Sequence, residues 1–246
     1  MAHDRPGFRL GRSDAVEWLR RLPSGSVDLV ITDPPYESLE KHRAIGTTTR
    51  LKHSKASSND WFDIFPNQRF PELFAEIHRV LRPNSHFYLF CDPETMFVAK
   101  PLGEAAGFKF WKPLIFDKVS IGMGYHYRAR YECILFFEKG KRKLSDLGVA
   151  DIITAPRVRG GYPAEKPVAV SQVLIRQSSL EGELVVDPFM GSGSVGVAAV
   201  GLGRGFLGND LCEEAVAVSR RRLVEAGAGE GLEIRPGGQI DLALSI

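Results

Sequence analysis

The feature that most constrains this fold is an apolar run, residues 27–32, which stops abruptly at Asp33, Pro34, Pro35 and Tyr36. A short apolar run bounded by turn formers is typical of a strand buried in a parallel sheet. Two successive prolines cannot continue the hydrogen-bonded ladder, so the chain must leave the sheet in a stiff bend. The run therefore predicts a buried strand that presents Asp33 at its carboxyl end, the edge where open α/β sheets bind ligands.

The bend would bring the Asp33 carboxylate, the Pro34 carbonyl and the Tyr36 ring close together. Two hydrogen-bond acceptors beside a flat ring suit a planar group that bears an exocyclic amine. An isolated Asp-Pro-Pro-Tyr sequence is equally compatible with an Asx-Pro turn and a core tyrosine. A second stretch far downstream favours the functional interpretation.

That second stretch, residues 184–186, is another apolar run that ends at a carboxylate, Asp187. Glycines with the G-x-G-x-x-G spacing follow it: Gly191, Gly193 and Gly196. This spacing between a strand and a helix is typical of dinucleotide-binding turns, and Asp210 follows at about the expected ~20 residues. Taken alone, the glycines are compatible with a dehydrogenase, or with a turn that needs glycine only for close packing.

The position of Asp187 before the glycines favours a different ligand. A carboxylate there would crowd a pyrophosphate, but it would attract a cofactor that carries an ammonium and a sulfonium. S-adenosylmethionine is such a cofactor, and its ribose hydroxyls would be available to Asp210. Because the backbone must approach this ligand closely, we expect a Cβ at Gly193 to block its binding.

Strand and helix patterns alternate along the chain, with no internal repeat and no linker that would divide it. This alternation predicts one layered α/β domain over residues 1–246, with Ser13 capping the first helix. Two runs, residues 108–116 and 131–137, predict a hairpin at a sheet edge. The segments expected outside regular structure are a mobile loop over 37–60, a short stretch over 139–161 and a Gly-rich tail over 227–246.

Two of these regions carry side chains suited to nucleic acid. The predicted loop is basic and has no acidic residue between positions 41 and 55; its candidate contacts are Arg43, Arg50, Lys52 and Lys55. The turn of the hairpin alternates aromatic residues with arginines; its candidates are Tyr127, Arg128 and Arg130. Cations displace counterions from phosphates and rings stack on bases. A solvated loop and an exposed turn with core tyrosines are the alternatives.

Composition limits the partners of this chain. Its net charge of +2 means that a polyanion must meet a local patch of the surface. The three cysteines lie far apart and the six histidines show no ligand spacing, so we expect neither a disulfide nor a metal. No apolar run nears the ~18 residues that span a bilayer, and the N-terminus has no signal-peptide core. We therefore expect a cytoplasmic protein without a membrane partner.

The two carboxylate motifs together resemble those of the amino-methyltransferases that modify exocyclic amines of DNA bases. The motifs are Asp33-Pro34-Pro35-Tyr36 and Asp187-Pro188-Phe189-Met190-Gly191-Ser192-Gly193-Ser194. Their order resembles the β class of restriction-modification and orphan methylases. Tyr162-Pro163-Ala164-Glu165-Lys166-Pro167 is similar to the third motif of that class, although the family more often begins it with His. Asp14 is similar to the acid that the family places near the cofactor adenine.

This resemblance, which covers residues 8–226, implies a Rossmann-like S-adenosylmethionine-dependent methyltransferase fold. Such a fold has a mostly parallel seven-stranded sheet, an antiparallel edge hairpin and, here, a circularly permuted motif order. The resemblance implies catalysis by Asp33, Pro34, Pro35 and Tyr36 on a base flipped out of double-stranded DNA. It implies cofactor binding by Asp14, Tyr162, Lys166, Asp187, Phe189, Gly191, Ser192, Gly193, Ser194 and Asp210, with Lys166 near the methionine end.

The resemblance leaves the substrate open in part. Asp is common at the first position of the catalytic motif in adenine enzymes and Ser in cytosine enzymes, so Asp33 favours adenine-N6 over cytosine-N4. An RNA adenine methyltransferase and a DNA-binding module without turnover are further alternatives. The target-recognition region, expected over 139–161, is short for the family. We therefore expect modest sequence discrimination or a second subunit, for which a homodimer would suffice.

Overall fold

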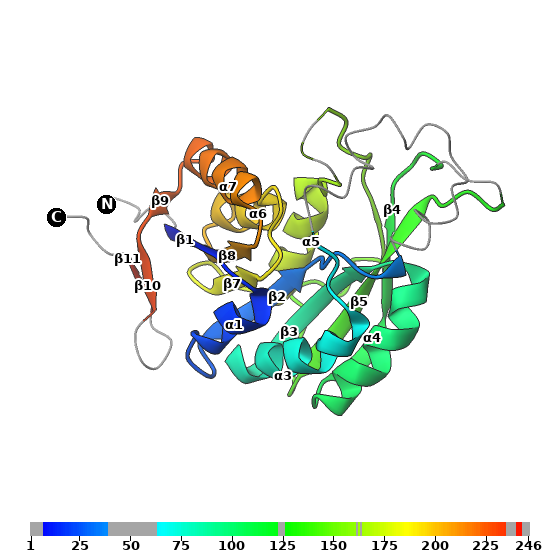
Figure 1. Ribbon diagram of the computed structural model, residues 1–246, viewed down its shortest axis with the longest axis horizontal. Coiled ribbons are helices and arrows are strands. Elements are labelled where there is room, and N and C mark those ends of the chain that lie inside the picture. Colours follow the sequence, from blue (N-terminus) through cyan, green and yellow to red (C-terminus); the bar gives the residue numbers. More distant parts are fainter. Residues whose placement is uncertain are drawn as a thin grey trace.

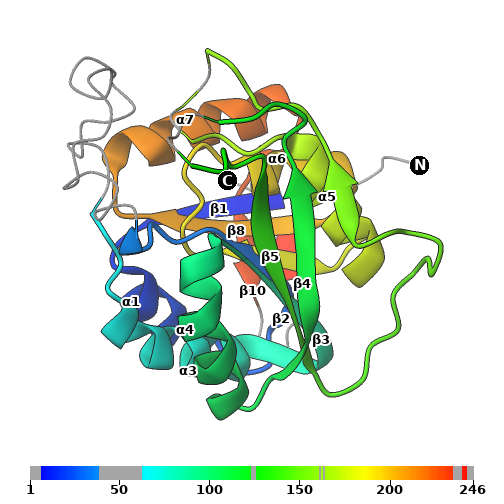
Figure 2. The same ribbon diagram turned by 90° about the vertical axis from the view of Figure 1, so that its right-hand side faces the viewer.

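The computed structural model describes residues 7–38, 63–122, 126–160, 162, 164–234 and 240–242. In this part of the chain, one large sheet lies between two layers of helices (Figures 1 and 2). One face is covered by α1 (Ala15–Arg20), α3 (Phe70–Val80) and α4 (Pro93–Ala105). The other is covered by α5 (Val168–Ser178), α6 (Ser194–Gly201) and α7 (Glu213–Glu225). The predicted α/β class is confirmed.

The main sheet has nine strands in the order β6-β4-β5-β3-β2-β7-β8-β1-β9. Their bounds are β1 (Gly7–Arg12), β2 (Val27–Thr32), β3 (Leu81–Cys91), β4 (Lys109–Asp117), β5 (Tyr131–Lys139), β6 (Ile152–Thr154), β7 (Leu184–Asp187), β8 (Gly205–Asp210) and β9 (Gly229–Glu230). Only β5 runs antiparallel to its neighbours in this sheet, β3 and β4. Seven strands thus form the predicted sheet, and short strands β6 and β9 extend it at its two edges.

The two sheet edges differ from the expectation. The β4–β5 hairpin is not at the edge, because β6 from the 139–161 segment pairs parallel with β4. The Gly-rich tail contributes β9, which pairs with β1, and β10 (Leu232–Ile234) pairs with β11 (Ile240–Leu242) in a separate antiparallel sheet. Strands of two or three residues have too few side chains to show a period, whereas an open sheet edge readily accepts such segments.

The first helix also begins differently from the expectation. Asp14, not Ser13, is its N-cap, because the Asp14 carboxylate accepts hydrogen bonds from the backbone N–H groups of Val16 and Glu17 at 3.0 and 3.2 Å. The Ser13 N–H instead donates to Asn209 Oδ1 at 3.1 Å. Both Ser and Asp are good caps, so the local sequence could not separate these adjacent positions.

The central strands owe their continuous apolar sequence to burial on both faces. In β2, Val30 packs among residues of α1, α3 and α4, whereas Leu29 and Ile31 pack among residues of α5, α6 and α7. Strands β2 and β7 are parallel neighbours, with Leu29 opposite Val185. Their carboxyl ends therefore emerge side by side at one edge of the sheet. Among the described residues, no helix is both long and apolar enough to span a lipid bilayer.

Candidate active site

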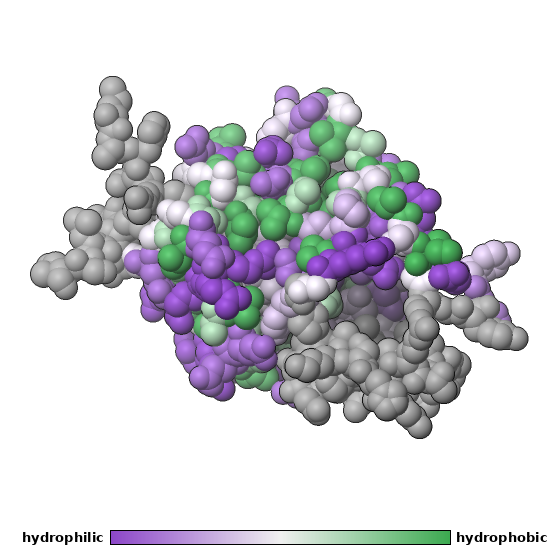
Figure 3. Space-filling model, turned by 90° about the horizontal axis from the view of Figure 1, so that it is seen from above, coloured by the Kyte–Doolittle hydropathy of each residue, from purple (hydrophilic) through white to green (hydrophobic). Residues whose placement is uncertain are grey.

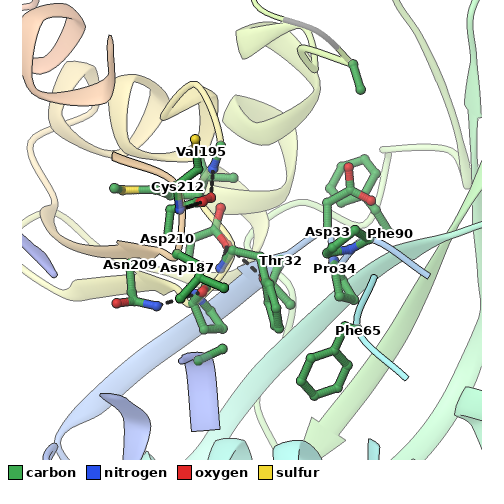
Figure 4. A pocket seen from close by; sticks show the side chains of 18 of the residues that line it. Thr32, Asp33, Pro34, Phe65, Phe90, Asp187, Val195, Asn209, Asp210 and Cys212 are labelled. Carbon is green, nitrogen blue, oxygen red and sulfur yellow. Dashed lines mark hydrogen bonds between the residues drawn. The ribbon is translucent and has the colours of Figure 1, made fainter. Parts of the chain in front are cut away.

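A cavity of about 560 Å³ opens at this edge, where β2 and β7 end (Figure 4). Asp33 and Pro34 lie on one side of Thr32, and Asp187 and Asp210 lie on the other. The Thr32 hydroxyl donates a hydrogen bond to Asp187 Oδ1 at 2.7 Å, so the end of β2 is tied directly to the end of β7. The predicted site residues that line this cavity are Asp14, Asp33, Pro34, Pro35, Tyr36, Tyr162, Lys166, Asp187, Phe189, Gly191, Ser192, Ser194 and Asp210.

The Asp33 carboxylate forms an ion pair with Lys166, which precedes α5. Burial raises the pKa of Asp33, and the ammonium of Lys166 opposes that rise. Lys166 was expected near the methionine end of the cofactor, but here its ammonium contacts the carboxylate of the catalytic motif. It also lies 3.3 Å from Glu132 on β5, whose second oxygen is 2.5 Å from Lys118. Neither Glu132 nor Lys118 was predicted as a site residue, because nothing in their local sequence distinguishes them from solvated charges.

The Pro34-Pro35 bend is held by the segment that returns to the site at residue 63. The Pro35 carbonyl accepts a hydrogen bond from the Phe65 N–H at 2.7 Å, and the backbones of Tyr36 and Phe65 pair in a single parallel β-bridge. Tyr36 is only 8% exposed, and burial raises its pKa. Its ring thus belongs mainly to the core, and only a small part of it can face the cavity. Phe65, which was also not predicted, packs edge-on against Phe189, with 5.1 Å between the ring centroids. It thus connects the Asp33-Pro34-Pro35-Tyr36 motif to the motif that begins at Asp187.

Asp187 has no ion-pair partner in the described part of the chain. Its Oδ1 accepts hydrogen bonds from the Thr32 hydroxyl and, at 3.0 Å, from the Phe189 N–H. Both donors are neutral, and burial raises the pKa of Asp187 to about 7. A buried carboxylate in this state would gain from the arrival of a positively charged ligand.

The glycines that follow have different roles. Gly191 has φ +50°, its N–H donates to Asp210 Oδ2 at 2.9 Å, and a Cβ built on it would have Tyr162 as its nearest neighbour, at 4.0 Å. A Cβ on Gly193, at φ +76°, would instead lie 2.7 Å from the Ser219 hydroxyl on α7. The expectation that a Cβ at Gly193 meets the ligand is therefore wrong, because helix packing occupies that space. Gly191 is the glycine beside the cavity.

Asp14 lines the cavity, but its carboxylate is already engaged. Besides capping α1, it accepts two hydrogen bonds from the Arg69 guanidinium, at 2.6 and 2.9 Å. Arg69 lies in the short helix η4 (Asn67–Arg69), and its hydrogen bonds lower the pKa of Asp14. A contact between Asp14 and a cofactor adenine therefore stays a prediction, and the adenine would have to share a carboxylate that four donors already use.

The residues expected to contact nucleic acid fall in two groups. Those of the basic loop, Arg43, Arg50, Lys52 and Lys55, lie outside the described residues. Those of the β4–β5 turn are placed: Tyr127 is fully exposed, Arg128 donates to the Gly122 carbonyl at 2.7 Å, and Arg130 pairs with Asp117 through two hydrogen bonds of 2.6 and 2.7 Å. The turn thus presents an exposed aromatic ring, followed in the chain by two arginines that are fixed to their own hairpin.

The side chains that could ligate a metal were also compared in space. Within the ranges that the structure covers, no three His, Cys, Asp or Glu side chains are grouped so that they could hold a metal ion. Cys91 and Cys133 are free and buried, and Cys212 is free and half-buried beside the cavity.

Comparison with known proteins agrees with this geometry. A family model described as DNA methylase, of the N6/N4 methyltransferases, matches residues 27–157 and 149–221. The Type II methyltransferase M.HpaI of Haemophilus parainfluenzae is 27% identical over 87% of this chain and 74% of its own. The DNA adenine methyltransferase YhdJ of Escherichia coli K12 is 28% identical over 85% of this chain and 80% of its own.

Two solved structures share the fold. The complex of M1.HpyAVI with S-adenosylmethionine has a TM-score of 0.65 at 22% identity and covers 88% of this chain and 99% of that one. The cytosine-N4-specific PvuII DNA methyltransferase has a TM-score of 0.68 at 17% identity and covers 87% of this chain and 86% of that one. The matched family uses S-adenosylmethionine, the cofactor expected from the sequence. With its family match, its fold and its paired strand ends, the chain belongs to the N6/N4 DNA methylase family, the methyltransferases that act on exocyclic amines of DNA bases.

Proposed function

We propose that this protein transfers a methyl group from S-adenosylmethionine to N6 of an adenine in double-stranded DNA. The observation that carries this proposal is the pair of strand ends around one cavity. Asp33 lies on one side and Asp187, which has no cationic partner among the described side chains, lies on the other. One end suits an amine, and the other suits a cationic cofactor.

The residues at the end of β7 fit the cofactor. Asp187 would receive its ammonium, because a buried carboxylate with only neutral donors is stabilised by a cation. Asp210 would accept from ribose hydroxyls through the lone pairs left by its bonds to the N–H groups of Gly191 and Cys212. Gly191 leaves the space that a close approach needs. When bound, S-adenosylmethionine supplies an electrophilic methyl group on a sulfonium centre.

The residues at the end of β2 would hold the target amine. An exocyclic amine is a poor nucleophile because its lone pair is delocalised into the ring. Hydrogen bonds from the amine to Asp33 and to the Pro34 carbonyl would favour a tetrahedral nitrogen and would stabilise the positive charge that develops there. The stiff double-proline bend would keep both acceptors aligned, and alignment lowers the barrier further. Tyr36 would act mainly by supporting that bend, because its ring is almost buried.

A base in a duplex cannot reach this cavity and must be flipped out. Tyr127, Arg128 and Arg130 at the tip of the hairpin would contact the DNA, together with the cations of residues 41–55. Hydrophilic and hydrophobic residues are interspersed on the described surface seen in Figure 3. Because the net charge is only +2, DNA would have to meet a local patch of that surface. A second copy of the chain would add recognition surface that the short 139–161 segment does not provide.

Adenine is favoured over cytosine by the Asp at position 33 and by the similarity to YhdJ. Cytosine-N4 is the second candidate, because the fold is similar to that of the cytosine-N4-specific PvuII DNA methyltransferase.

The test is a transfer assay with S-adenosylmethionine labelled in the methyl group and, in parallel reactions, duplex DNA or RNA of mixed sequence. After hydrolysis to nucleosides, we expect the label in N6-methyldeoxyadenosine. Label in N4-methyldeoxycytidine would support the second candidate, and label in RNA alone would contradict both. Tight binding of NADH without binding of S-adenosylmethionine would overturn the scheme. Sequencing of methylated DNA from a host that expresses the protein would then give the recognition site.

A further inference from the structure

Lys166 lies between two carboxylates, and only one of them is fully engaged with it. Its ammonium donates a hydrogen bond to Asp33 Oδ2 and lies 3.3 Å from Glu132 Oε2. Glu132 Oε2 is buried, and it accepts no hydrogen bond from the residues that the structure describes. A buried carboxylate oxygen without a well-formed hydrogen bond is costly, so this atom would gain from a closer approach of the Lys166 ammonium.

Lys118 holds Glu132 in this position. Its ammonium lies 2.5 Å from Glu132 Oε1, and both side chains are largely buried at the base of the β4–β5 turn. Although burial alone would raise the pKa of Glu132, Lys166 and Lys118 together lower it. The ionised Glu132 therefore keeps its second oxygen directed towards the ammonium of Lys166.

The ion pair with Lys166 conflicts with the role proposed for Asp33. A carboxylate that is bonded to an ammonium has one oxygen occupied and is a weaker acceptor for a neutral amine. Lys166 cannot simply leave Asp33, because a buried ammonium without a counter-ion is strongly destabilising. Release of Asp33 therefore requires a second carboxylate within reach of Lys166.

We propose that Glu132 is a positioning residue that takes over the ammonium of Lys166 when the target base enters, and thereby frees Asp33 to accept the hydrogen bond of the exocyclic amine. This inference rests on the proposed function. The displacement is small, because Lys166 Nζ is already 3.3 Å from Glu132 Oε2. No proton is transferred, and the two lysines and two carboxylates remain electrically balanced before and after the exchange.

The test compares two variants of the same strand. Glu132→Gln keeps the shape of the side chain but removes the charge that would hold Lys166. We expect its single-turnover rate of methyl transfer to fall about 10- to 100-fold, less than the roughly 10²–10³-fold cost of removing one preorganised contact outright, because Asp33 itself remains. The dissociation constant for S-adenosylmethionine should stay within about twofold, since charged hydrogen bonds are lost only at the other end of the cavity.

Glu138→Gln is the matched control, because Glu138 lies at the far end of β5 and does not line the cavity. It should lower thermal stability without changing the transfer rate. A wild-type rate in Glu132→Gln would overturn the proposal. Equal losses of rate and of cofactor affinity in that variant would also overturn it, because they indicate a general structural role.

A second measurement does not depend on activity. In a crystal structure of Asp33→Ala, the ammonium of Lys166 should be ordered at about 2.8 Å from Glu132 Oε2, the length of a charged hydrogen bond. An ammonium that turns away from Glu132 would overturn the exchange. If the wild-type protein methylates no DNA, the proposed function fails, whereas this crystal structure still decides whether Glu132 can take over Lys166.

Discussion

Strands β2 and β7 lie side by side and each ends in Asp-Pro, yet their two carboxylates have opposite surroundings. Asp33 has a cation within the chain, Lys166. Asp187 accepts hydrogen bonds only from neutral donors of the described chain, and its pKa rises to about 7 because of burial. The same local sequence therefore has two electrostatic settings. On the proposed function, Asp187 would gain most from a cation that a ligand brings, whereas Asp33 would exchange the cation that it already has.

The largest effect that tests this comparison is expected for Asp33→Ala. Removing the acceptor of the target amine should lower the transfer rate by about 10³-fold, the upper range for losing one preorganised electrostatic contact. Binding of S-adenosylmethionine should be unchanged, because Asp187 and Asp210 remain. Single-turnover kinetics and titration calorimetry measure the two quantities. If both fell together, the two strand ends would not have separate roles.

Asp187→Asn should give the reverse pattern. Loss of a buried charge opposite an ammonium costs about 1.5–3 kcal/mol, so affinity for S-adenosylmethionine should fall about 10- to 100-fold. A cofactor analogue without the amino group should bind the wild type and this variant with equal affinity. The unfolding temperature without cofactor should not fall, since the variant removes a buried carboxylate that has only neutral partners. If Asp187→Asn bound S-adenosylmethionine as tightly as the wild type does, the ammonium of the cofactor would lie away from residue 187.

Sequence reasoning found both strand ends because their signals are local: an apolar run, a carboxylate, a proline and the spacing of glycines. It could not find what makes the ends differ, because those partners are distant in the chain. Thr32 and Asp187 are 155 residues apart, and Lys166 and Asp33 are 133 apart. The family resemblance implied Lys166 near the methionine end of the cofactor, and the contact of its ammonium with Asp33 has no signal in the sequence around either residue.

The same limit applies to Glu132 and Gly193. A glutamate at the start of an apolar strand has the sequence of a solvated strand end, and only the approach of Lys118 and Lys166 gives it another role. The glycine spacing predicted the turn correctly. It could not show that the missing side chain of Gly193 faces Ser219 on α7, because helix packing in three dimensions decides which glycine faces the ligand.

The glycine turn provides a smaller test on the β7 side alone. Gly191→Ala should weaken binding of S-adenosylmethionine about tenfold, because its Cβ would project beside the cavity and its positive φ would cost about 1–2 kcal/mol. Gly193→Ala should act on stability instead, since its Cβ would clash with Ser219. Calorimetry of binding and thermal unfolding of both variants separate the two effects. If Gly193→Ala lost affinity at unchanged stability, the ligand would lie closer to α7 than the cavity indicates.

An effect of about the same size is expected from pH, and it follows from Asp187, which has no cationic partner among the described residues. Burial raises the pKa of Asp187 from its ordinary value of 3.8 to about 7, so in the cofactor-free protein this group is mostly protonated at pH 6 and mostly ionised at pH 8. Only the ionised form attracts an ammonium, so affinity for S-adenosylmethionine should be about tenfold lower at pH 6 than at pH 8. The sign is opposite for stability: because the folded pKa is raised, ionisation of Asp187 opposes folding, and its contribution to stability without cofactor should fall as pH rises from about 4 through 7.

Asp187→Asn should flatten the pH dependence of binding, whereas Asp33→Ala should retain it. A slope that survived in Asp187→Asn but vanished in Asp33→Ala would assign the cofactor's cation to the other strand end and reverse the comparison.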